Sequence, residues 1–240
     1  MTAPSSLETL REFAPTISVG ILTADLLRLG SEVSLIEQAG VKVVHFDVMD
    51  GCFCPMMTLG PPLIKAVKTP LLKDVHLMIE EPLDKVGDYV AAGADLITIH
   101  AESCRHPHRV LQQLGKMENA NQAARGLIRG VALNPGTPLE TIEPLLGELE
   151  MILLLAVNPG WGGQKFIEST HERLREVKKM VQKSGNDILI AVDGGIKRDN
   201  VAEMGASGVD LVVTGSAVFD GKAPSQNAKY MIAALHASPA

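Results

Sequence analysis

Short runs of aliphatic and β-branched residues alternate along the chain with longer stretches in which apolar residues recur at helical spacing. The short runs predict eight strands, over Ile17–Leu22, Lys42–Asp47, Leu72–Met78, Leu96–His100, Gly130–Leu133, Met151–Val157, Ile188–Val192 and Leu211–Thr214. The longer stretches predict a helix after each strand, over Leu26–Gln38, Pro62–Val67, Leu83–Ala92, Pro107–Lys116, Leu139–Leu146, Ser169–Lys183, Asp199–Met204 and Ser225–Leu235.

Eight strand–helix units within 240 residues predict an α/β fold, a single (β/α)8 TIM barrel. Similar small-residue steps recur where a helix is expected to end and the next strand to begin, at Ala39-Gly40, Ala92-Gly93 and Gly205-Ala206. The alternative is an open, doubly wound sheet. Such sheets usually carry about five or six strands, so eight strands favour the barrel.

No linker or low-complexity segment divides the chain, so we expect one domain over residues 1–240, with a core of about residues 15–221. Residues 1–14 and 236–240 are expected to fray. The polar stretch Met117–Gly126 is interpreted as an extension of the fourth helix or its loop, lying at the surface away from the carboxyl ends of the strands and available for an oligomer contact.

The charge balance gives no sign of a nucleic-acid or membrane partner. Lys and Arg total 22 against 28 Asp and Glu, a net charge of −6 without the basic excess that nucleic-acid binding favours. The longest apolar run, Met151–Val157, is far shorter than the ~20 residues of a membrane-spanning helix.

The cysteines and the N-terminus favour a reducing compartment. Three cysteines are too few for a disulfide framework, and Cys52 and Cys54 have no second cysteine pair to complete a zinc site. Met1–Gly20 contains acidic residues and lacks the apolar region of a secretory signal. We therefore expect a cytoplasmic protein.

Ionisable side chains gather at the carboxyl ends of three predicted strands, where barrels carry their chemistry. Strand alternation puts His45 and Asp47 on one face, and His76 and Asp193 end two further strands. No Lys or Arg lies in these motifs to pair with the acids, so a divalent cation would offset the cost of burying them. The residue types suit Zn, Fe, Mn or Co, and a structural polar cluster is the alternative.

Glycine-rich turns follow the last three strands. They are Asn158-Pro159-Gly160-Trp161-Gly162-Gly163-Gln164, Asp193-Gly194-Gly195 and Thr214-Gly215-Ser216-Ala217. Glycine lets backbone N–H groups approach phosphate oxygens closely, and barrels often bind phosphate after strands seven and eight. Three neighbouring turns therefore favour a phosphate site over simple tight turns.

A metal beside two carboxylates, with a phosphate site nearby, suggests a phosphorylated ketose as substrate. The metal can polarise the ketone and stabilise an ene-diolate. Two carboxylates on opposite sides of the carbon beside that ketone can remove a proton on one face and return it on the other. Paired carboxylates thus favour epimerisation over isomerisation.

The chain resembles the ribulose-phosphate 3-epimerase family from about Ile17 to Gly221. The resemblance rests on an ordered set of motifs, which includes His45-Phe46-Asp47-Val48-Met49-Asp50-Gly51, Asp74-Val75-His76-Leu77-Met78-Ile79, Leu133-Asn134-Pro135-Gly136, Val157-Asn158-Pro159-Gly160-Trp161-Gly162-Gly163-Gln164 and Val192-Asp193-Gly194-Gly195. Other phosphate-binding barrels share the late glycines but lack the first two motifs. The set is therefore specific.

This resemblance implies a metal-dependent epimerase that converts D-ribulose 5-phosphate into D-xylulose 5-phosphate, in a homo-oligomer. It implies that one divalent metal is held by His45, Asp47, His76 and Asp193. Asp47 and Asp193 would also transfer the protons at C3. The sugar phosphate would contact His76, Gly162, Gly163, Gly194, Gly195, Gly215 and Ser216. Met49 and Met78 match two family methionines near the ene-diolate, and Leu155 stands at the third position.

The sequence departs from the family pattern around the expected sugar site. Gly20 replaces a serine that touches substrate, Cys52 and Met56 replace a histidine and an asparagine, and Trp161 replaces a phenylalanine. Lost polar contacts change substrate discrimination. Two alternatives therefore stay open: an epimerase for another ketose phosphate, such as a ketohexose 6-phosphate, and a non-catalytic sugar-phosphate-binding protein.

Overall fold

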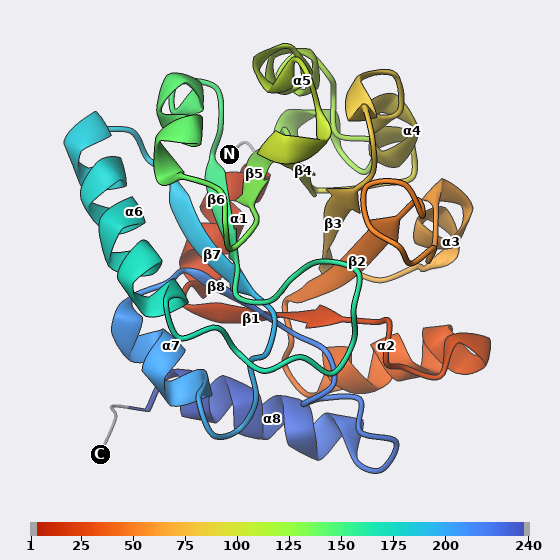
Figure 1. Cartoon of the computed structure of the whole chain (residues 1–240). Helices are drawn as coiled ribbons and strands as arrows, with labels where there is room; N and C mark the ends of the chain where they lie inside the picture. The colour runs from red at the N-terminus through yellow and green to blue at the C-terminus, as the bar shows by residue number, and fades with distance from the viewer. Residues whose placement is uncertain (1–3, 238–240) are drawn as a thin grey trace.

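The computed structural model describes residues 4–237, and over this range eight strands pair in parallel, each with its neighbours in the chain. β8 pairs with β1, so the sheet closes into a barrel with helices around it (Figure 1). The predicted (β/α)8 barrel is confirmed. The strands are β1 (Thr16–Gly20), β2 (Val43–Met49), β3 (Leu72–Met78), β4 (Leu96–His100), β5 (Ile128–Leu133), β6 (Met151–Leu155), β7 (Leu189–Asp193) and β8 (Leu211–Thr214).

The outer layer contains α-helices and short 3-10 helices. The α-helices are α1 (Ser6–Phe13), α2 (Leu29–Gln38), α3 (Pro61–Ala66), α4 (Val86–Ala91), α5 (Pro107–Leu114), α6 (Thr170–Ser184), α7 (Val201–Ser207) and α8 (Pro224–Leu235). The 3-10 helices are η1 (Leu26–Arg28), η2 (Pro82–Asp84), η3 (Ala101–Ser103), η4 (Ala123–Arg125) and η5 (Leu139–Leu145). Among these residues, no helix combines the length and the apolar character needed to cross a lipid bilayer.

Several predicted element boundaries were wrong. The strand predicted over Ile17–Leu22 ends at Gly20, and the one predicted over Met151–Val157 ends at Leu155, because the last residues of each run turn into the loops of the barrel mouth. The helix predicted over Leu139–Leu146 is the 3-10 helix η5. Pro144 lies inside it and has no N–H to donate to an α-helical hydrogen bond.

Strand alternation sorts the core into two layers. Val43, Leu72 and Leu96 point into the barrel and form an inner apolar cluster. Val44 and Phe46, on the other face of β2, pack against the helices in the larger outer cluster. This is the alternation predicted for β2, and it directs the intervening His45 and Asp47 toward the barrel interior.

The N-terminal segment is more ordered than the sequence suggested. Residues 6–13 form α1, so the expectation that residues 1–14 fray was wrong for this helix. Ser5 and Glu8 form a reciprocal capping box at its start. Leu10 is fully buried among the inner-cluster side chains at the amino ends of the strands. The helix therefore covers the end of the barrel opposite the strand carboxyl ends.

The polar stretch Met117–Gly126 is a folded loop rather than a helix extension. Its Asn119 is buried, and the side-chain nitrogen donates to Asp95 Oδ1 at 3.0 Å and to the Gly126 carbonyl at 2.9 Å. Asn119 Oδ1 accepts hydrogen bonds from the backbone N–H groups of Asn121 and Gln122. The loop is thus anchored to the start of β4 through Asp95.

Candidate active site

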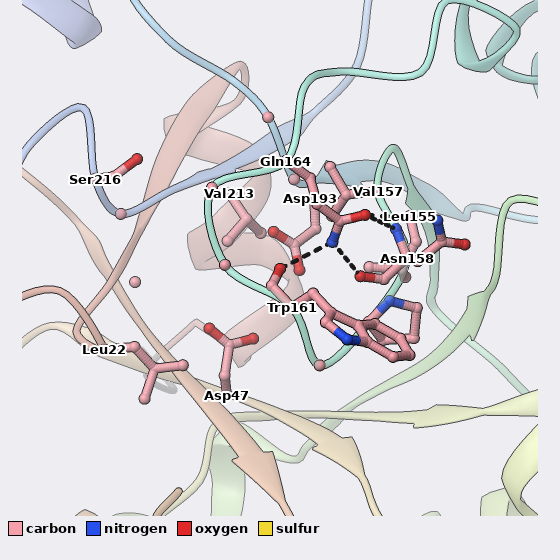
Figure 2. Close-up of a pocket in the computed structure, with 18 of the residues that line it drawn as sticks. Leu22, Asp47, Leu155, Val157, Asn158, Trp161, Gln164, Asp193, Val213 and Ser216 are labelled. Carbon is pink, nitrogen blue, oxygen red and sulfur yellow. Dashed lines mark hydrogen bonds between the residues drawn. The ribbon is translucent and has the colours of Figure 1, made fainter. Parts of the chain in front are cut away.

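A cavity of about 380 Å³ opens at the carboxyl ends of the strands. Figure 2 shows Asp47 and Asp193 facing it from different strands, with the loop that carries Trp161 and Gln164 across its rim. The predicted glycines Gly162, Gly163, Gly194, Gly195 and Gly215 line this cavity together with Ser216. The structure therefore brings the two predicted groups of site residues to one opening.

The four predicted metal ligands form one cluster. His45 and Asp47 lie on β2, His76 lies on β3 opposite Asp47, and Asp193 ends β7. Each offers one ligand atom, and these atoms all lie within 4.8 Å of one another. The two imidazoles are fully buried, whereas the Asp47 and Asp193 side chains are 17% and 15% exposed. The carboxylates are thus the part of the cluster that a ligand in the cavity can reach.

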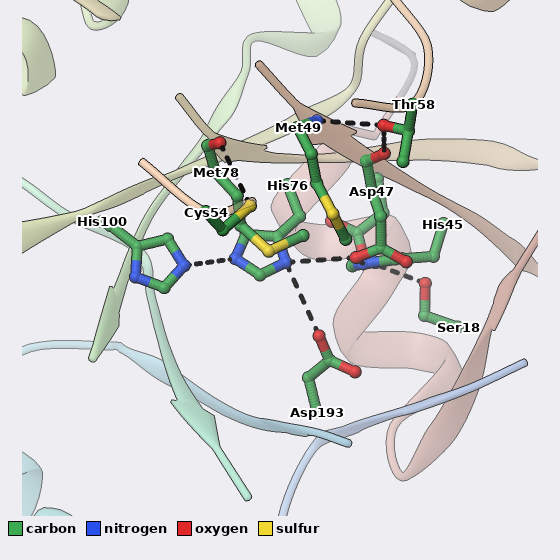
Figure 3. A network of polar contacts seen from close by, with 11 residues as sticks. Ser18, His45, Asp47, Met49, Cys54, Thr58, His76, Met78, His100 and Asp193 are labelled. Atoms are coloured by element: carbon green, nitrogen blue, oxygen red, sulfur yellow. Dashed lines mark hydrogen bonds and ion pairs between the residues drawn. The ribbon is translucent and has the colours of Figure 1, made fainter. Parts of the chain in front are cut away.

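His76 lies between the two carboxylates. Its Nδ1 is 3.5 Å from Asp47 Oδ1 and 3.5 Å from Asp193 Oδ2, and His45 Nε2 is 3.1 Å from the same Asp47 oxygen (Figure 3). Within residues 4–237, the buried His76 Nδ1 has no hydrogen-bond partner. A buried nitrogen without a partner is costly unless another group satisfies it.

The electrostatics of the cluster favour bound positive charge. Burial lowers the pKa values of His45 and His76, but the surrounding carboxylates outweigh it and raise both above the usual value. Burial likewise raises the pKa of Asp47, and the neighbouring imidazoles reverse this and lower it. Two imidazole nitrogens and two carboxylate oxygens therefore fit a divalent transition metal, which would also satisfy His76 Nδ1.

Asp74 supports the cluster from behind, and the sequence analysis did not assign it to the site. Its Oδ2 accepts hydrogen bonds from His45 Nδ1 at 2.7 Å and from Ser18 Oγ at 2.8 Å. With its Nδ1 proton donated to Asp74, His45 would offer a bound metal the lone pair of Nε2, the nitrogen beside Asp47. Asp74 and His76 share a face of β3, so alternation in the sequence carried a signal for Asp74.

A second buried histidine, His100 at the end of β4, was also missed. It is fully buried and contacts His76. Burial lowers the pKa of His100 to about 4, so its imidazole is neutral at neutral pH. Its place at the end of a correctly predicted strand, two residues before Glu102, was the available signal.

The glycine turns hold backbone conformations that other residues rarely adopt. Gly194 and Gly195 have φ angles of 105° and 69°. A Cβ atom on Gly195 would lie 2.6 Å from the Phe166 backbone nitrogen, and one on Gly194 would lie 2.3 Å from Val157 Cγ2. Glycine is therefore required here for the turn after β7 to pack under the loop after β6.

The Gln164 side chain organises the loop over residues 158–164. Its Oε1 accepts from the Asn158 N–H at 3.1 Å, while its Nε2 donates to the carbonyls of Asn158 at 2.6 Å and Trp161 at 2.8 Å (Figure 2). Exposed Lys197 also lines the cavity and adds a cation near the glycine turns. Neither role was assigned from the sequence.

The positions that depart from the family pattern are placed differently. Gly20, Met56 and Trp161 line the cavity, as do Met49, Met78 and Leu155. Cys52 is exposed and is absent from the cavity lining. A Cβ atom on Gly20 would meet Gly215 Cα at 3.6 Å and Asp47 Oδ2 at 3.9 Å, which are ordinary contacts. A small side chain would therefore fit at residue 20.

Sequence comparison identifies one family over most of the chain. The model of the ribulose-phosphate 3 epimerase family matches residues 16–219. Ribulose-phosphate 3-epimerase of Bacillus subtilis is 43% identical over 206 residues, covering 85% of this chain and 91% of that protein. Its Escherichia coli K12 counterpart is 44% identical over 210 residues, covering 85% and 88%. The resemblance seen in the motifs is confirmed.

Solved structures of lower identity share the fold. The 3-hexulose-6-phosphate synthase of Salmonella typhimurium superposes with a TM-score of 0.65 at 19% identity, over 92% of this chain and 98% of that one. At this identity the likeness supports the barrel architecture alone.

Proposed function

The chain belongs to the ribulose-phosphate 3 epimerase family, and from this premise we propose that it interconverts D-ribulose 5-phosphate and D-xylulose 5-phosphate by inverting C3. It is an enzyme of the epimerase class. The observation that carries the proposal is the position of Asp47 and Asp193, which approach one buried imidazole nitrogen from two strands and both line the cavity.

The two aspartates perform the proton transfers. β8 and β1 separate β7 from β2, so Asp193 and Asp47 reach the substrate from different sides. One carboxylate removes the proton from C3, and the other delivers a proton to the opposite face, which inverts the centre. The lowered pKa of Asp47 keeps it ionised at neutral pH, which is the form that can accept a proton.

His45, Asp47, His76 and Asp193 would hold one divalent transition metal. When bound, that ion supplies stabilisation of the negative charge that develops on the substrate oxygens beside C3. The ligand of the cavity is a sugar phosphate. Its phosphate is held by the backbone of Gly162, Gly163, Gly194, Gly195, Gly215 and Ser216, with Lys197 adding positive charge.

Two measurements on the purified protein test this proposal: metal content, and exchange of the C3 hydrogen of D-ribulose 5-phosphate in deuterated water. We expect about one transition metal per chain and exchange that a chelator abolishes. Asp193→Asn should slow exchange about 100- to 10 000-fold, since it removes one proton-transfer group. A metal-loaded protein without exchange would contradict the proposal and favour the non-catalytic alternative.

A second substrate is favoured by one observation: Gly20 leaves room for a small group beside Asp47 and Gly215. A ketohexose 6-phosphate is therefore the competing substrate. Parallel kcat/KM measurements on both sugars decide between them, and turnover of the hexose phosphate above that of D-ribulose 5-phosphate would replace the first proposal. A homo-oligomer, a cytoplasmic location, a single domain over residues 1–240 and the lack of a nucleic-acid partner stay predictions.

A further inference from the structure

A buried imidazole that takes no part in the proposed mechanism lies directly behind His76. His100 Nε2 is 2.8 Å from His76 Nε2, and the two rings stack with centroids 5.0 Å apart and planes inclined by 19° (Figure 3). Two imidazole nitrogens at this distance share one proton, because two protons would clash and none would leave two lone pairs opposed. The shared proton belongs either to His76 Nε2 or to His100 Nε2.

The far side of His100 decides this choice. Its Nδ1 lies 3.1 Å from Glu102 Oε2, and a carboxylate accepts hydrogen bonds without donating them. His100 therefore carries its proton on Nδ1. The ring is fully buried, and burial disfavours the charged imidazolium, so Nε2 has a lone pair and accepts the proton of His76 Nε2. With its own proton on Nε2, His76 would offer a bound metal the lone pair of Nδ1, the nitrogen that faces Asp47 and Asp193.

Glu102 is itself held in one orientation. Its Oε1 accepts from the backbone N–H of Asn134 at 2.7 Å and from the Thr137 hydroxyl. Arg173 of α6 donates to the carbonyls of Thr137 at 2.7 Å and Asn134 at 3.2 Å, which fixes the loop after β5. Oε1 is thus committed to donors, and Oε2 is the oxygen left for His100.

We propose that His100 and Glu102 are positioning residues that fix the tautomer of His76 so that its Nδ1 lone pair faces the carboxylates of the proposed metal site. His45 reaches the same result by a shorter route, because Asp74 accepts its Nδ1 proton directly. The two histidines therefore offer opposite ring nitrogens to the cluster, and each is fixed by a partner at its other nitrogen.

Glu102→Gln tests the proposal, because the amide has the same shape as the carboxylate but replaces one accepting oxygen with a donating nitrogen. Asn134 N–H and Thr137 Oγ–H need an oxygen, which directs the amide nitrogen toward His100. That nitrogen donates to His100 Nδ1 and moves the His100 proton to Nε2. His76 Nε2 must then accept, which puts a proton on His76 Nδ1 and blocks its lone pair.

The measurement is Co²⁺ affinity of the metal-free protein, followed by the visible absorption of the bound ion. We expect Glu102→Gln to weaken Co²⁺ binding about 10- to 100-fold. His100→Phe interrupts the chain between Glu102 and His76. In that background, adding Glu102→Gln should change Co²⁺ affinity less than about twofold, as a double-mutant cycle reports. An equal loss in both backgrounds would identify a long-range charge effect and overturn the proposal.

Nitrogen-15 spectra of the histidines give a second readout that needs no variant to fold. In the Zn²⁺-loaded wild type, His100 should be protonated on Nδ1 and unprotonated on Nε2. A proton on His100 Nε2 would overturn the proposal. The inference rests on the metal site of the proposed function, yet neither readout uses substrate. Protein that binds Co²⁺ as expected but does not epimerise would contradict the proposed reaction and leave this inference standing.

Discussion

The two sides of the barrel mouth differ in whether side chains or backbone groups face the cavity. From β2 to β4, buried ionisable side chains stand on strands and contact one another in pairs, as His45 does with Asp74 and His76 with His100. From β6 to β8, where Asp193 is the exception, the loops at the cavity are rich in glycine, and their packing leaves no room for a Cβ atom at Gly194 or Gly195. Apart from Asp193, the first side presents ionisable side chains, and the second presents mainly backbone.

Because of this division, we expect that a substitution can impair metal binding without impairing phosphate binding, and the reverse. The side-chain cluster depends on charge and on proton positions, which isosteric substitutions alter without moving the backbone. The glycine side depends on φ angles and close packing, which a single methyl group disturbs without changing any charge. Substitutions on the two sides should therefore produce opposite signatures in metal content and in phosphate binding.

Asp47→Asn should have the largest effect, because it removes a proposed metal ligand and a proposed proton-transfer group in one step. We expect kcat to fall about 1000-fold and bound metal to be lost, while inorganic phosphate binds the protein as tightly as before. Metal analysis and calorimetric titration with phosphate measure the two sides separately. A variant with full metal content and full rate would contradict the dual role of Asp47.

Gly195→Ala should give the opposite signature. The added Cβ would lie 2.6 Å from the Phe166 nitrogen at a residue with a φ angle of 69°. We expect kcat/KM to fall about 10- to 100-fold through weaker phosphate binding, with metal content unchanged. Gly185→Ala is the matched control, since its φ angle is 70° and nothing lies within 4 Å of the added atom. Equal losses in both variants would mean that strain alone explains the result.

Stability in acid should depend on the buried hydrogen bonds of Glu102. Burial raises the pKa of Glu102, but hydrogen bonds from His100, Thr137 and Asn134 outweigh it and lower the pKa to about 2. A lowered pKa contributes stability above the unfolded value of about 4.5, and this contribution is lost as pH falls toward 2. Between about pH 4.5 and 3, urea unfolding should show a loss on the order of 1 kcal/mol larger in the wild type than in Glu102→Gln. Parallel curves for the two proteins would contradict the lowered pKa.

Gly20→Ser should have the smallest effect, because the added Cβ meets nothing closer than 3.6 Å. We expect unchanged thermal stability and a preference for D-ribulose 5-phosphate over a ketohexose 6-phosphate that rises by a few-fold, about 2- to 10-fold. The ratio of the two kcat/KM values measures this preference. An unchanged ratio would show that Gly20 does not determine the substrate.

Alternation along single strands allowed the sequence to predict the barrel and to bring His45, Asp47, His76 and Asp193 together. Alternation within one strand does not give the register between strands. That register sets His45 opposite Asp74 and Asp47 opposite His76. The partners behind the cluster therefore stayed hidden. Side chains that fold back on their own loop, as Gln164 does, leave no periodic signal at all.

The N-terminal helix was missed for another reason. Ser5 and Glu8 have the spacing of a capping box, so a local signal was present. That signal alone does not predict a stable helix. The helix is held because Leu10 packs into the inner apolar cluster, which forms only when the barrel closes.

The pairing of β1 with β8 also has a consequence for synthesis on the ribosome. Thr16 pairs with Leu211, and α8 then packs against α2 and β1. A nascent chain therefore holds an open-edged sheet until β8 has emerged. Exposed strand edges invite wrong association, so newly made chains should depend most on chaperone protection until β8 has emerged. The metal and phosphate sides of the mouth can therefore meet only after β7 and β8 have been synthesised.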